Sequence, residues 1–117
     1  MPLDPETALM LQEMQARGFP AMSDGTPAQG RAMLRAFAGV DRRDAALLPP
    51  IAEIRDQTVG GVPARVYRPH PDSIVPTVVF LHGGGFVIGD LDTHDVPVRL
   101  LATDIGAVVV SLSLIHI

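Results

Sequence analysis

The chain has 117 residues, of which 47% are hydrophobic and 19% charged, and its net charge is −4. This composition is typical of a globular domain, and the small, scattered charge argues against a nucleic-acid partner. Without cysteine, a disulfide framework and a thiolate metal site are excluded. The first residues lack the features of a signal peptide, and no apolar run reaches the ~18 residues of a membrane span, so we expect a cytoplasmic protein with no membrane partner.

Two short amphipathic helices are predicted ahead of any strand. Residues 4–6, Asp-Pro-Glu, form a helix-start signal, because a carboxylate caps free N–H groups and proline fits the first helical position. Arg-Gly at residues 17–18 ends this helix. Its apolar stripe comprises Ala8, Leu11 and either Met14 or Gln15. The second helix begins at Thr26-Pro27 and ends at Gly39. Its apolar side chains are Met33, Leu34 and Phe37.

A change to period two at residue 51 predicts strands. Two alternating segments flank Gly60-Gly61, which favours a β-hairpin. Residues 77–81 are apolar after the first, as in a strand buried on both faces at the centre of a parallel sheet. A helix pattern with Val96 and Leu100 follows, with Leu101 and Ile105 beside them, and residues 107–110 form a second apolar strand. This order predicts one βαβ unit.

The loop at residues 82–90, His-Gly-Gly-Gly-Phe-Val-Ile-Gly-Asp, is the segment that indicates chemistry. Three successive glycines are costly in backbone entropy, and they follow a parallel strand where open α/β sheets bind ligands. Glycine lets a substrate approach the backbone amides, which can then donate to the negative oxygen of an acyl-transfer intermediate. A His-Gly-Gly-Gly segment directly after a strand is typical of the oxyanion loop of lipases and esterases.

Residues 78–95, VVFLHGGGFVIGDLDTHD, resemble the hormone-sensitive-lipase-like (bacterial family IV) carboxylesterases of the α/β-hydrolase superfamily. The resemblance extends upstream over nearly the whole chain and ends near Ser111. It implies an incomplete α/β-hydrolase fold of the α/β class, with amino-terminal cap helices at residues 1–48. The start of the core, with the hairpin and the first βαβ unit of the central sheet, would occupy residues 49–117. It further implies hydrolysis of a small-molecule ester through a serine acyl-enzyme in the full-length parent, with no metal or organic cofactor.

Residue roles follow from the same resemblance. The amides of Gly84 and Gly85 would stabilise the oxyanion, and Gly83 would shape the loop. His82 would hold the loop through hydrogen bonds rather than act as a base, because in these folds the base follows the nucleophile. The residues expected to support the loop and start the next helix are His82, Asp90, His94 and Asp95.

Other functions are less well supported by the residues. A phosphate loop would need Gly-Lys-Ser/Thr or G-x-G-x-x-G spacing, which the glycines do not have. His82 and His94, with Asp92 or Asp95, lack the i, i+4 pairing of a zinc helix. Residues 21–25 mimic a nucleophile elbow, but they lack its first glycine and follow a helix, so we interpret them as a turn.

The chain contains no Gly-x-Ser-x-Gly, so no member of the catalytic triad is expected in it. Residues 112–117, Leu-Ser-Leu-Ile-His-Ile, depart from the resemblance, which suggests a truncated or frame-disrupted gene product, and His116 is not expected to be the triad base. The alternative function is a catalytically silent binding or interaction module derived from the same fold. An exposed edge on the strand at residues 107–110 would favour aggregation, and hence the broken-enzyme interpretation.

Overall fold

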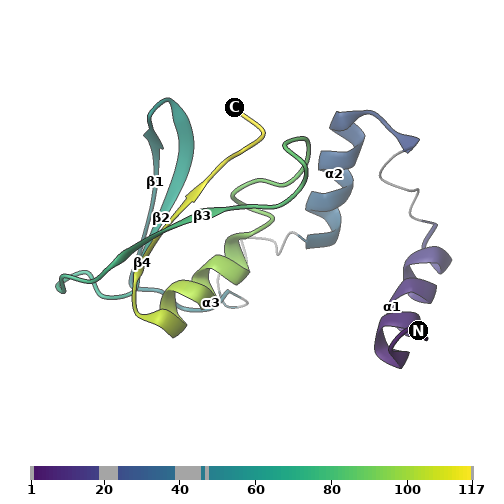
Figure 1. Cartoon of the computed structure of the whole chain (residues 1–117), viewed down its shortest axis with the longest axis horizontal. Coiled ribbons are helices and arrows are strands. Elements are labelled where there is room, and N and C mark those ends of the chain that lie inside the picture. Colours follow the sequence, from purple (N-terminus) through teal and green to yellow (C-terminus); the bar gives the residue numbers. More distant parts are fainter. Residues whose placement is uncertain (1, 19–23, 39–45, 47, 117) are drawn as a thin grey trace.

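The computed structural model describes residues 2–18, 24–38, 46 and 48–116 (Figure 1). The elements in chain order are α1 (Pro5–Ala16), α2 (Pro27–Ala38), β1 (Glu53–Val59), β2 (Val62–Arg68), β3 (Thr77–Leu81), α3 (Asp95–Ile105) and β4 (Val108–Leu112). The strands form one sheet in the order β1-β2-β4-β3. The β1–β2 and β2–β4 pairs are antiparallel, whereas β3 and β4 are parallel. The predicted hairpin and βαβ unit are therefore confirmed.

Local capping explains where the first two helices begin. The Asp4 carboxylate accepts hydrogen bonds from the backbone N–H groups of Glu6 and Thr7, at 2.9 and 3.3 Å. Thr26 and Gln29 form a reciprocal capping box at the start of α2, in which each side chain accepts from the other's backbone N–H. Both predicted starts are confirmed, and the predicted end of the second helix at residue 39 lies outside the described residues.

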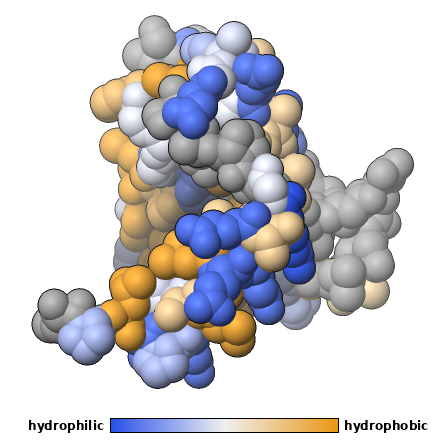
Figure 2. Space-filling model, turned by 90° about the vertical axis from the view of Figure 1, so that its right-hand side faces the viewer, coloured by the Kyte–Doolittle hydropathy of each residue, from blue (hydrophilic) through white to orange (hydrophobic). Residues whose placement is uncertain are grey.

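The amino-terminal helices leave much apolar surface uncovered. The stripe predicted for α1 is wrong at Leu11, which is 39% exposed, and its neighbours Leu9 and Met10 are more exposed still. Figure 2 shows hydrophobic surface among hydrophilic residues on the side of the molecule where α1 and α2 lie. Met10, Met14 and Phe37 line a small cavity where these two helices meet. Side chains of both helices therefore line one cavity, but α1 buries none of its residues.

The hairpin turn needs its two glycines. Val59 pairs with Val62, so Gly60 and Gly61 are the whole connection. Their φ angles of +57° and +84° lie in the left-handed region, which other residues rarely adopt. The predicted turn is confirmed.

Strand β3 is not buried on both faces, contrary to prediction. It lies at the edge of the sheet, and Val79 and Leu81 are 59% and 57% exposed. No element of the described chain covers the face that carries these two side chains. The predicted exposed edge on residues 107–110 is wrong as well, because β4 inserts between β2 and β3 and pairs with both. The edges of the described sheet are therefore β1 and β3.

The core lies between the sheet and α3. Tyr67, Val98, Ala102 and Val109 are fully buried and pack together. Of the apolar residues predicted for α3, Leu101 packs against this core, whereas Leu100 and Ile105 are 47% and 50% exposed. The helix instead turns Asp95, Val98 and Ala102 inward, because Asp95 bonds to buried polar groups of β2.

Candidate functional site

The glycine loop between β3 and α3 directs two carbonyl groups into its own hydrogen bonds. The Gly83 carbonyl accepts from His82 Nδ1 at 2.8 Å. The Gly84 carbonyl accepts from the N–H groups of Val87 and Ile88, at 3.1 and 3.0 Å. A trans peptide is planar, so its C=O and the following N–H point in opposite directions. The N–H groups of Gly84 and Gly85 therefore point away from these contacts, and neither donates a hydrogen bond to any described residue.

Close approach within the loop requires glycine at two positions. A Cβ on Gly84, whose φ is +124°, would lie 2.0 Å from the Ile88 carbonyl oxygen. A Cβ on Gly89, whose φ is +85°, would lie 2.6 Å from the Gly83 oxygen. By contrast, a Cβ on Gly83 would meet no atom within 4 Å. The loop geometry thus depends strictly on Gly84 and Gly89, and sequence reasoning assigned no such requirement to Gly89.

His82 is buried beneath the loop with both ring nitrogens occupied. Because the Gly83 carbonyl can only accept, Nδ1 carries the proton, and the Leu114 N–H donates to the unprotonated Nε2 at 2.9 Å. The imidazole also stacks on His94, with ring centroids 5.3 Å apart. A neutral histidine with these contacts has no free nitrogen to take a proton from a nucleophile.

Asp90 links the loop to the turn that precedes α3. Its Oδ1 accepts from the backbone N–H groups of Asp92 and Thr93, at 3.0 and 2.8 Å, and its Oδ2 accepts from Arg35 of α2. Burial alone would raise the pKa of Asp90, but the hydrogen bonds from Thr93 and Arg35 outweigh it and hold the pKa below its ordinary value. The carboxylate therefore stays charged and joined to α2 at neutral pH.

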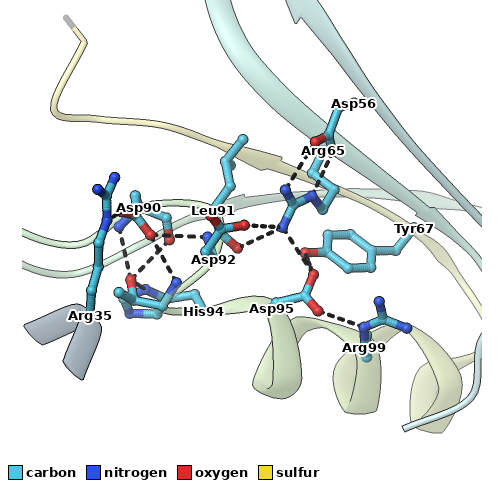
Figure 3. Close-up of polar contacts among 11 residues, drawn as sticks. Arg35, Asp56, Arg65, Tyr67, Asp90, Leu91, Asp92, His94, Asp95 and Arg99 are labelled. Carbon is cyan, nitrogen blue, oxygen red and sulfur yellow. Dashed lines mark hydrogen bonds and ion pairs between the residues drawn. The ribbon is translucent and has the colours of Figure 1, made fainter. Parts of the chain in front are cut away.

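A second group of charges, centred on Asp95, is buried beneath the sheet (Figure 3). Asp95 is 2% exposed and accepts from Tyr67 Oη at 2.7 Å, Arg65 Nη1 at 3.1 Å and Arg99 Nε at 2.7 Å. Burial would raise the pKa of Asp95, but the hydrogen bonds from Arg99 and Tyr67 and the two guanidinium charges lower it. This carboxylate ties β2 to the first turn of α3.

Arg65 extends this network to the hairpin and the loop. Its guanidinium forms two bonds with Asp56, at 2.6 and 3.0 Å, and also contacts Asp92 and the Leu91 carbonyl oxygen. Burial would lower the pKa of Arg65, but the acceptors around it, Asp56 first, raise the pKa well above its usual range. The charge at residue 65 is therefore permanent and compensated within the network.

His94 starts α3, as predicted, but does not cap it with its side chain. The ring packs against His82 and Phe80, and Nδ1 lies 3.0 Å from Thr93 Oγ1. Burial, together with the nearby His82, lowers the pKa of His94 despite the opposing effect of Asp90. His94 is thus a packing residue below the loop.

Three alternative sites weighed in the sequence are a metal site, His116 as a base and a nucleophile elbow at residues 21–25. No group of three or more potential ligands that could hold a metal occurs among the described residues. His116 contacts Ser113, whose Oγ lies 2.7 Å from Nδ1, but Ser113 is only 1% exposed and cannot meet a substrate. Residues 21–23 of the rejected elbow lie outside the described part of the chain.

No helix in the described residues is both long and apolar enough to cross a bilayer.

Sequence reasoning missed the arginines that hold the loop and its helix. Arg35 lies 55 residues from Asp90, and Arg65 lies 30 residues from Asp95. The hydrogen bond from Tyr67 to Asp95, 28 residues away, likewise had no sequence signal. Only the helical i, i+4 spacing of Asp95 and Arg99 was available as a signal.

Comparisons with known proteins agree with this fold and loop. A family model described as "alpha/beta hydrolase fold" matches residues 78–114. The carboxylic ester hydrolase LipN of Mycobacterium tuberculosis is 36% identical over 94% of this chain and 30% of its own length. An acetyl esterase of Salmonella agona is 49% identical over 45% of this chain and 16% of its own length. The crystal structure of a hyperthermophilic esterase from the archaeon Pyrobaculum calidifontis superposes with a TM-score of 0.80 and 37% identity, covering 97% of this chain and 36% of that one.

The family-model match and the superposed esterase together show that this sheet, with its parallel βαβ unit, is part of an α/β-hydrolase fold. Within that superfamily, the similarity to LipN and to solved esterases supports the resemblance to the hormone-sensitive-lipase-like (family IV) carboxylesterases, and the chain corresponds to the amino-terminal portion of such a fold. The chain spans about a third or less of the length of these relatives.

Proposed function

We propose that this chain supplies the oxyanion-binding portion of a serine carboxylesterase. The observation that carries the proposal is the orientation of two consecutive peptide groups, whose carbonyls are bonded inside the loop while the N–H groups of Gly84 and Gly85 point away. Two adjacent backbone donors without partners suit an oxygen that becomes negative as a carbonyl is attacked. The backbone carbonyl of Gly83, bonded to His82, orients the first of these peptides without requiring glycine at that position.

Each donor contributes chiefly in the transition state. Removing one oxyanion donor from a hydrolase typically costs ~10²–10³ in rate, or about 2.7–4 kcal/mol. In the reaction that we propose, a serine attacks the ester carbonyl and gives its proton to a histidine–carboxylate pair, which passes the proton to the departing alcohol as the acyl-enzyme forms. Water then attacks the acyl-enzyme, which releases the carboxylic acid and restores the serine. This chain contributes the donors and their support, with His82 neutral beneath them, and the nucleophile lies in the remainder of the enzyme.

The relatives support this division of labour. LipN is described as a carboxylic ester hydrolase and is aligned with this chain over less than a third of its own length. The substrate class that follows for the parent is a small carboxylic ester, with no metal or organic cofactor. We further propose that residues 1–48 belong to a cap over the acyl site and that residues 49–117 begin the hydrolase core.

A chimeric enzyme tests the proposal. Residues 1–111 are fused to the part of LipN that follows its matched segment, and hydrolysis of p-nitrophenyl butyrate is measured. Gly84→Ala should lower kcat by at least ~10², because its Cβ would meet the Ile88 carbonyl oxygen at 2.0 Å and turn the donors away. Gly83→Ala is the matched control, since its Cβ has free space, and kcat should stay within about 3-fold.

Two results would contradict the proposal. Equal losses in the two glycine variants would show that loop geometry does not govern the rate. A burst of p-nitrophenol from the 117-residue chain alone, blocked by a serine-directed phosphonate, would show that the chain holds its own nucleophile. We expect no burst from it.

A further inference from the structure

Helix α2 contacts the outer half of the glycine loop through three neighbouring residues. Gly30 is the one buried residue of this helix, and a Cβ there would lie 3.2 Å from Ile88 Cγ2. Arg31 donates from Nε to the Val87 carbonyl oxygen at 2.7 Å, and Arg35 forms an ion pair with Asp90. Arg31 and Arg35 are four residues apart and so share one face of the helix. This face meets the loop at three successive points.

The loop residues held in this way are the ones that fix the glycine peptides. Val87 and Ile88 donate to the Gly84 carbonyl, which sets the plane of the Gly84–Gly85 peptide. Little else restrains this segment, since Gly85 and Phe86 are exposed and Val87 is 44% exposed. A shift of α2 would therefore be passed directly to the outward N–H of Gly85.

We propose that α2 positions the oxyanion loop, with Arg35 acting as a positioning residue through Asp90. The proposal rests on the proposed function of the loop. Donors act on an oxyanion only at about 2.7–3.1 Å, and a misplacement of ~1 Å can lower a rate by ~10². Asp90 is suited to transmit the position of α2, because its other oxygen holds the turn before α3. Figure 3 shows Arg35 reaching Asp90 from its helix while Asp90 faces that turn.

The first test uses the 117-residue chain and amide hydrogen exchange measured by NMR. Arg35→Gln should speed exchange at Val87 and Ile88 by about 3- to 10-fold and shift the Gly84 and Gly85 amide resonances, while sheet amides keep their rates. Arg55→Gln is the control, because Arg55 also pairs with an acid, Glu53, and its side chain is 69% exposed against 59% for Arg35. The control should change no loop amide. Loop amides that do not respond to Arg35→Gln, or a uniform increase over the sheet, would overturn the proposal.

The second test uses the chimera with p-nitrophenyl butyrate. Arg35→Gln should lower kcat by about 10-fold with KM within 2-fold, and Arg35→Lys, which keeps the charge, should restore most of kcat. A fall in expression or stability with unchanged kcat would show that the pair is only structural and would overturn the proposal. An inactive parent chimera would count against the proposed function alone, and the exchange experiment would still decide whether α2 positions the loop.

Discussion

The Asp95 carboxylate gives the sharpest test of how this fold is held together. It is 2% exposed and accepts hydrogen bonds from Tyr67, Arg65 and Arg99. Asp95→Ala would remove the acceptor of the buried Tyr67 hydroxyl. It would also remove the ion pairs that Asp95 forms with the guanidinium groups of Arg65 and Arg99. Removing one partner from a buried ionic group costs about 3–5 kcal/mol of unfolding free energy. For a chain of this size, that lowers Tm by roughly 10–25 °C.

Urea unfolding measures this loss directly. Tyr67 is the single tyrosine and the chain has no tryptophan, so tyrosine fluorescence reports the core beside Asp95 without interference. At a slope of about 1.5 kcal/mol per molar urea, the midpoint should fall by roughly 2–3 M in Asp95→Ala. Asp104→Ala removes an exposed acid from the same helix and should change the free energy by less than ~0.5 kcal/mol.

Equal midpoints for Asp95→Ala and Asp104→Ala would refute the reasoning, because they would mean that Asp95 is not buried among cations. Tyr67→Phe, followed by circular dichroism, separates the contributions. It removes one donor and keeps both guanidinium partners, so it should cost about 1–2 kcal/mol.

Three further outcomes can be measured on the same chain. The pKa of His94 is below its ordinary value of 6.5 and those of Asp90 and Asp95 are below 3.8, so each group takes up protons more readily when unfolded. The urea midpoint should therefore be highest above about pH 7, fall below pH 6.5 and fall steeply below pH 4. A midpoint that rises on acidification would contradict these directions. Phe86 has a φ of +62°, in the left-handed region that favours glycine and disfavours β-branched residues, and its side chain is 73% exposed. Phe86→Gly should therefore leave the free energy of unfolding unchanged or raise it by up to about 1 kcal/mol, whereas Phe86→Val should lower it by about 1 kcal/mol. The reverse order of stability in urea unfolding would exclude the left-handed backbone. The exposed Val79 on the uncovered face of β3 is expected to promote association between chains. Val79→Lys places a charge there and should reduce light scattering at high protein concentration. Unchanged scattering would show that this face does not drive association.

The features that sequence patterns predicted correctly are local ones. The Asp4 cap, the two-glycine hairpin and the strand–loop–helix–strand order each depend on residues within a few positions of one another. Backbone geometry and hydrogen-bonding needs act over that range, so residue type is informative. The same holds for the place of the glycine loop, between a strand and a helix.

Long-range pairing explains the parts that were wrong or missed. Asp95 and Arg65 are charged residues that a periodicity rule assigns to the surface, yet each neutralises the other inside the protein. For the same reason, the apolar pattern of α3 did not indicate that the acid at residue 95 points inward while Leu100 is exposed. The apolar pattern of β3 indicated burial on both faces, but the described chain supplies a cover for only one. The ion pair between Arg35 and Asp90 joins segments whose contact no local rule predicts.

The strand order has a consequence for how the chain folds during synthesis. Hairpin β1–β2 can form as soon as residue 68 has been made, whereas β3 has no hydrogen-bonded neighbour until β4 arrives and pairs with both. A ribosome that stalls before Val108 would hold a hairpin and a solitary apolar strand with nothing to join them. Of the four described strands, β4 is translated last and is the one that joins the others, so nascent chains should be most vulnerable to chaperone capture and proteolysis in the interval between Leu81 and Val108.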